Sequence, residues 1–213
     1  MERATISQAK ELFRENFIGI DELMPMLKVM GLSEGNFCIP EINYSIAKLE
    51  KYSEEYILIL GLSEAAGKGL SIATFRDFFG VDSDRSEPCF YNQDWYLHEN
   101  FIKYTLNNKW YLLKKEVIEE TRAIQPSEIL KGNVSFPSAV LCTYTFFANY
   151  YINNTFLWYH DFIWCRDVDH NGDRIYIGKY NDIDGANKNG FSIHRHLALR
   201  DCYASIDVLK CKD

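Results

Sequence analysis

Residues 136–152, FPSAVLCTYTFFANYYI, constrain the architecture of this chain more than any other segment. Their large apolar side chains recur at the spacing of an α-helix and form two separate stripes. One stripe holds Val140, Tyr144, Phe147 and Tyr151, and the other holds Phe146 and Tyr150. One helix face has no room for both stripes, so the helix either lies between two layers of the fold or offers its second stripe to a partner chain. We favour burial within the fold and keep a homo-oligomer contact as the alternative.

Signals for helices dominate the N-terminal third. Thr5 and Gln8 have the spacing of a capping box, which predicts a helix directly after Thr5. A second helix is predicted with Asp21 as its N-cap and Gly31 just beyond its end. After a first strand, Ser71 is the expected cap of a further helix. We therefore expect this third of the chain to be mostly helical.

Signals for strands dominate the rest of the chain, outside the aromatic-rich helix. The expected strands cover residues 95–104, 110–118, 156–166, 174–180, 191–199 and 203–209. The first two have the pattern of a hairpin, and the later ones have the spacing of an antiparallel meander. The sequence therefore predicts an α+β fold, with a helical N-terminal third followed by a mainly antiparallel sheet and one aromatic-rich helix over 136–152. We expect a single domain over 1–213, with a weak subdivision into a helical segment over residues 1–80 and a mainly antiparallel β segment over residues 89–213.

Composition excludes several classes of partner. The chain of 213 residues has 23 basic and 30 acidic residues, and its net charge of −7 offers no basic surface to nucleic acid or to an anionic membrane. The longest apolar run, residues 56–62, is far shorter than the roughly 20 residues that span a bilayer. The first residues lack the apolar core of a signal peptide. We therefore expect a cytoplasmic protein without nucleic-acid or membrane partners.

Cysteines and glycines indicate no redox or nucleotide chemistry. The six cysteines are scattered without a C-x-x-C pair, which favours reduced thiols, and Cys89 has no recognisable base as a partner. The segment 61–69 superficially resembles a phosphate-binding P-loop. It has five residues between its glycines where that loop has four, and Gly69 follows Lys68 where that loop has Ser or Thr. We therefore assign no catalytic residue and no nucleotide site.

The segment DVDHNGD, residues 167–173, resembles the opening of an EF-hand calcium loop. Its oxygen-bearing side chains stand at alternate positions: Asp167, Asp169, Asn171 and Asp173. Gly178 occupies the position where that loop carries its bidentate Glu, and both flanks have strand patterns where the family has helices. The alternative is a hairpin turn in which Asp and Asn side chains bind their own backbone. Ca²⁺ is therefore the one cofactor that we consider from this motif.

A second candidate metal site lies in the predicted strand 191–199. Alternation places His194 and His196 on one face of the strand, where two imidazoles can share a transition metal. A third ligand is required, and the candidates are His160 and Asp161. The alternative is a solvated polar face opposite a buried apolar one.

Aromatic residues make up 15% of the chain, more than a core of this size needs when aliphatic residues do most of the packing. The segment 90–96, FYNQDWY, mixes rings with amide and carboxylate groups, which suits a sugar or peptide surface, with core packing as the alternative. The favoured function is a soluble, non-enzymatic binding or protein-interaction module for a protein or small ligand. The alternatives are a metal-dependent hydrolase that uses His194 and His196, and a protein with a structural calcium loop at 167–173.

Overall fold

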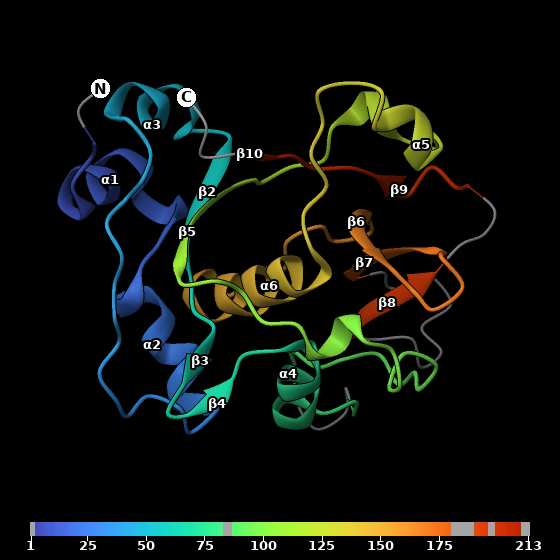
Figure 1. Ribbon diagram of the computed structural model, residues 1–213, viewed down its shortest axis with the longest axis horizontal. Helices are drawn as coiled ribbons and strands as arrows, with labels where there is room; N and C mark the ends of the chain where they lie inside the picture. Colours follow the sequence, from blue (N-terminus) through green and yellow to red (C-terminus); the bar gives the residue numbers. More distant parts are fainter. Residues whose placement is uncertain (1–2, 83–86, 180–189, 196–198, 210–213) are drawn as a thin grey trace.

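Figure 1 shows the computed structural model of the chain, which describes residues 3–82, 87–179, 190–195 and 199–209. The helices are α1 (Ile6–Phe13), α2 (Ile20–Val29), α3 (Ile46–Tyr52), α4 (Ile72–Phe79), α5 (Pro126–Ile129) and α6 (Ala139–Asn153). Short 3₁₀ turns are η1 (Arg14–Asn16), η2 (Phe101–Lys103) and η3 (Glu119–Thr121). The strands are β1 (Phe17–Ile18), β2 (Tyr56–Gly61), β3 (Glu64–Ala65), β4 (Lys68–Gly69), β5 (Lys109–Lys114), β6 (Phe162–Val168), β7 (Arg174–Lys179), β8 (Phe191–Arg195), β9 (Tyr203–Ala204) and β10 (Val208–Leu209).

Helix α6 lies between two sheets (Figure 1). One sheet has the strand order β1-β2-β5-β10, the other has the order β8-β7-β6-β9, and β3 and β4 form a small separate hairpin. The neighbours pair antiparallel except for β1 with β2 and β6 with β9, which are parallel. The predicted α+β fold, with helices concentrated in the N-terminal region, is confirmed. The single domain over 1–213 stays a prediction.

Both apolar stripes of α6 lie largely inside the fold. Every residue from Ala139 to Asn149 is buried, and α6 contacts α2, α4, β6 and β7. The side chain of Ser138 caps the first turn by accepting the backbone N–H of Leu141, and Asn154 ends the helix in the left-handed conformation. Burial between two layers, the favoured alternative for this helix, therefore accounts for both stripes.

Two of the three predicted N-caps are confirmed. The side chains of Thr5 and Gln8 form the expected capping box at the start of α1. Ser71 Oγ accepts the backbone N–H of Thr74 at 3.2 Å and starts α4. The expected N-cap of α2 is wrong, because Asp21 lies within its first turn. Gly19 is the N-cap instead, since the carboxylate of Glu22 reaches back to its backbone N–H at 3.0 Å.

The hairpin predicted between residues 95–104 and 110–118 is wrong. Residues 95–104 form turns and η2, while β5 pairs with β2 and β10. Side-chain anchors explain the difference: Tyr96 and Phe101 are buried, and Trp95 Nε1 donates to the carbonyl of Ile193 at 3.1 Å. These anchors hold the segment against α4, α6 and β8, so its rings pack into the core and it pairs with no strand.

The predicted strand 156–166 is shorter than expected. Trp158 and His160 have φ angles of 52° and 70°, in the left-handed region that breaks a strand, and β6 starts only at Phe162. No helix in the described portion of the chain is long and apolar enough to cross a membrane.

Candidate metal centre

One buried carboxylate holds the turn between β6 and β7. Asp169 Oδ1 accepts hydrogen bonds from the backbone N–H groups of Asn171 at 2.9 Å and of Asp173 at 2.8 Å. Gly172 has a φ of 87°, which glycine adopts without strain. The segment thus forms a hairpin turn in which an Asp side chain binds its own backbone.

Asp167, the first carboxylate of the calcium-like motif, serves a different element. Its Oδ2 accepts the backbone N–H of Ala139 at 2.7 Å, in the first turn of α6. Burial raises the pKa of Asp167 in spite of this hydrogen bond. Asp167 and Asp169 are therefore engaged by separate partners, while Asn171 and Asp173 contribute backbone N–H groups to the turn. Calcium binding at these four positions stays a prediction.

Glu99 brings a second buried carboxylate to this turn from a distant region of the sequence. Its side chain is only 8% exposed, and its backbone N–H donates to the carbonyl of Tyr96, which fixes the residue just before η2. Glu99 Oε2 accepts the backbone N–H of His170 at 3.0 Å, and Glu99 Oε1 lies 2.5 Å from Nδ1 of the same residue. The loop before η2 is thereby joined to the β6–β7 turn.

Glu99, Asp169 and His170 together form a group of metal-ligand type. One side-chain ligand atom of each lies within 4.8 Å of those of the other two. The two carboxylates are buried, whereas the His170 side chain is 67% exposed, so the group is closed on the protein side and open toward solvent. Among the described residues, no other three side chains of ligand type come this close together.

Arg195 pairs with Asp169 and also lies over an aromatic ring. Arg195 Nη1 lies 2.7 Å from Asp169 Oδ2, and its guanidinium lies 4.7 Å from the centre of the Trp95 ring. Burial acts to raise the pKa of Asp169. The hydrogen bonds from Arg195 and from the turn backbone outweigh this effect, and the pKa is lowered. Asp169 is therefore held as a carboxylate in a fixed orientation.

The group brings two acids, one arginine and one histidine together. Glu99 and Asp169 are both buried acids, and Arg195 pairs with one of them. His170 lies against the other, Glu99. A divalent cation at this point would be attracted by both carboxylates.

His194 lies at a different site, packed among rings. Its ring is stacked on Tyr176 with the centroids 5.5 Å apart, and it meets the edge of Phe162. Its Nδ1 lies 3.3 Å from Nε2 of Gln93, which donates to it. Burial lowers the pKa of His194 to about 4, so its imidazole is neutral at pH 7. His196 lies outside the described residues, and the His194–His196 site stays a prediction.

The two candidate third ligands for His194 have other surroundings. Asp161 Oδ1 lies 2.6 Å from Arg122 Nη1 in an ion pair. His160 is exposed, and its ring packs against the neighbouring Tyr159. Within the described ranges, neither residue joins His194 in a metal-type group.

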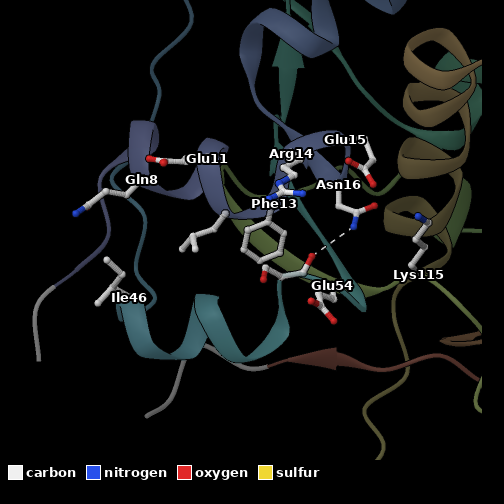
Figure 2. A pocket seen from close by; sticks show the side chains of 11 residues that line it. Gln8, Glu11, Phe13, Arg14, Glu15, Asn16, Ile46, Glu54 and Lys115 are labelled. Carbon is white, nitrogen blue, oxygen red and sulfur yellow. Dashed lines mark hydrogen bonds between the residues drawn. The ribbon is translucent and has the colours of Figure 1, made fainter.

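A pocket of about 650 Å³ opens on the other side of the molecule, between α1, η1, α3 and Lys115 (Figure 2). Asn16 lines it and donates to the carbonyl of Ser53 at 3.4 Å. Charges of both signs surround it: Glu11, Glu15 and Glu54 against Arg14 and Lys115. This mixture selects no charge for a ligand, and no site residue predicted from the sequence lines the pocket.

The aromatic segment 90–96 contributes mainly to the core. Phe90 and Tyr96 are buried, and Trp95 is half-buried. The neighbouring Cys89 is also buried, and burial raises the pKa of its thiol to about 11, which is inconsistent with a reactive nucleophile. The core-packing alternative therefore describes these rings.

Sequence reasoning missed Glu99 and Arg195. Glu99 stands 70 positions before Asp169, and nothing in the sequence indicates that the two meet. Arg195 gives one signal, because it alternates onto the apolar face of its predicted strand, where a charge requires a partner.

No family model, curated protein or solved structure matches this chain. The assignment of function therefore depends on the geometry of the sites alone.

Proposed function

We propose that this chain is a metal-binding protein in which Glu99, Asp169 and His170 hold one divalent cation. The observation that carries the proposal is the convergence of three ligand atoms within 4.8 Å from two segments far apart in sequence. Burial of both carboxylates adds to it, because the surrounding protein shields the two ligand side chains from solvent and fixes their position.

The donor set favours a transition metal over calcium. Two carboxylate oxygens and one imidazole nitrogen suit Zn²⁺ or Mn²⁺, whereas Ca²⁺ prefers six to eight oxygen ligands. Three protein ligands leave positions for water on the exposed side of His170. Ca²⁺ held by the motif Asp167, Asp169, Asn171 and Asp173 is kept as the alternative cation.

Binding of the metal would replace one hydrogen bond and would keep the hydrogen bonds that already orient Asp169. The cation takes the place of the proton between His170 Nδ1 and Glu99, so its affinity should fall in acid. Arg195 and the N–H groups of the turn already orient Asp169, as outer partners do in metal sites. The metal would thus connect the loop before η2 to the β6–β7 turn.

We propose a binding role rather than hydrolysis. The hydrolase alternative needs both His194 and His196, and Nδ1 of His194 is engaged by Gln93. An interaction module with an aromatic-rich surface, alone or as a homo-oligomer, is the second proposal, and the burial of α6 lends it no support.

A cytoplasmic location is supported by Cys142 and Cys165, which are neighbours and carry free thiols.

The test is calorimetric titration of chelator-treated protein with Zn²⁺, Mn²⁺ and Ca²⁺ separately. Glu99→Gln and His170→Gln each remove one ligand, and we expect each to weaken Zn²⁺ binding by about tenfold or more. His98→Gln is the matched control, because His98 is exposed and adjacent to Glu99. Unchanged affinity in both ligand variants would overturn the proposal. A Ca²⁺-specific response that survives Glu99→Gln would favour the motif at 167–173 instead.

A further inference from the structure

A second pocket, of about 590 Å³, lies at the N-terminal end of α6. It is bounded by β5, by β10 and by the loop that leads into α6. Its lining includes Tyr111, Ser138, Leu141, Val208 and Leu209. Its volume lies within the range of small-molecule sites, and its walls combine polar and apolar side chains in similar measure.

The charge of this pocket is opposite to that of the whole protein. The chain carries 30 acidic and 23 basic residues, yet the residues that line the pocket include Lys109 and Arg166 and no Asp or Glu. Ser138 and Leu141 also place the first turn of α6 at the pocket, where the helix dipole is positive. The nearby Asp167 caps Ala139 and does not line the pocket.

Arg166 owes its position to an irregularity in β6. The register of β6 against β7 shifts between Trp164 and Val168, which marks a β-bulge, and bulges re-aim side chains. The backbone N–H of Arg166 donates to the carbonyl of Pro137, outside the sheet. The side chain of Arg166 is exposed and makes no hydrogen bond or ion pair with a described residue, although its charge acts to lower the pKa of the neighbouring Asp167. Its five donors are therefore available to a ligand.

Lys109 is the second cation. Its Nζ lies 4.8 Å from the centre of the Tyr111 ring, which holds the ammonium at the pocket without neutralising it. Lys109 likewise forms no ion pair with a described residue. Two cations that no described acid pairs with lie in one pocket with the apolar side chains of Leu141, Val208 and Leu209. This arrangement is complementary to an anion with an apolar body.

We propose that this pocket binds a small organic anion, a phosphate or carboxylate attached to a planar ring. Arg166 and Lys109 bind the anionic group, and Leu141, Val208 and Leu209 contact the ring. The guanidinium suits this task because it offers paired N–H donors to two oxygens of a phosphate or carboxylate.

The probe for this site is phenyl phosphate, titrated by calorimetry into the full-length protein in the presence of a chelator, so that the result is independent of the metal site. We expect phenyl phosphate to bind more tightly than inorganic phosphate or benzyl alcohol, because each of these supplies only one half of the ligand. Arg166→Gln should weaken binding by about tenfold. Lys103→Gln, which removes an equal charge from the exposed surface of η2, should leave binding unchanged.

Three results would overturn the proposal. One is the absence of phenyl phosphate binding up to about 10 mM, which is above the millimolar dissociation constants of weak specific complexes. Another is equal binding by Arg166→Gln and the unmodified protein. The third is equal affinity for benzyl alcohol or for inorganic phosphate, which would show that the pocket does not recognise the combined ligand.

Discussion

Acidification from pH 7 to pH 5 is expected to lower the free energy of unfolding by about 2 kcal/mol through His194 alone. Burial against Tyr176 and Phe162 lowers the pKa of His194 from its ordinary 6.5 to about 4. The unfolded chain therefore takes up a proton on this residue at a higher pH than the native protein does. Between these two pKa values, stability rises with pH and falls on acidification.

The magnitude follows from the pKa difference. Each pKa unit corresponds to about 1.4 kcal/mol, so the total loss at pH well below 4 is about 3.4 kcal/mol. At pH 5 the native imidazole is still mostly neutral while the unfolded one is mostly protonated. The loss relative to pH 7 is then about 2 kcal/mol.

The assay is urea denaturation at pH 7, 6 and 5 of the unmodified protein, His194→Gln and His98→Gln. The glutamine at position 194 keeps an acceptor for the Gln93 amide but does not titrate. We expect His194→Gln to lose about 2 kcal/mol less than the unmodified protein over this range, and His98→Gln to follow the unmodified protein. Equal losses of stability in all three proteins would refute the reasoning, even where the proteins already differ in stability at pH 7.

Three further predictions concern other buried groups. Asp169→Asn should destabilise the protein by about 2 kcal/mol near pH 7 through loss of the pair with Arg195. Because the pKa of Asp169 is lowered, the difference in free energy of unfolding between the variant and the unmodified protein should decrease only below about pH 4 in denaturation curves. A difference that is constant with pH would contradict the ion-pair assignment. Phe147→Ala should cost about 3–5 kcal/mol by urea denaturation, since the ring is fully buried, and a cost under about 1 kcal/mol would contradict its place in the core. In a brief iodoacetamide pulse followed by mass spectrometry, Cys165 should be protected, because burial raises the pKa of its thiol, while Cys38 should react; equal labelling would contradict this burial.

The sequence was informative wherever the deciding interaction is local. The caps at Thr5 and Ser71 depend on hydrogen bonds to residues three positions away, and the stripes of α6 depend on helical spacing. Strand pairing was harder to predict. Periodicity shows that β5 is a strand, but its partner β2 lies some fifty residues earlier, and only side-chain anchors such as Tyr96 show that residues 95–104 do not pair with it.

The same distinction between local and tertiary interactions applies to the candidate site. Asp169 and His170 stand in a motif that is visible in the sequence, because its Asp-rich turn is local. Glu99 joins them only through tertiary structure, from a segment that precedes both β5 and α6 in the chain. The charge of Arg195 on an apolar strand face was the one signal that pointed toward a buried acid.

The short strand β10 has a consequence for the order of folding. It adds to the free edge of β5, where Val208 pairs with Leu113 and Leu209 with Leu112. These partners are almost a hundred residues apart, so the loop that they close is among the longest in the molecule and closes late. During synthesis on the ribosome, β1, β2 and β5 can assemble while the second sheet is still being made. Until residues 208–209 emerge, β5 is an open edge, and nascent chains should be most prone to associate with one another at that strand.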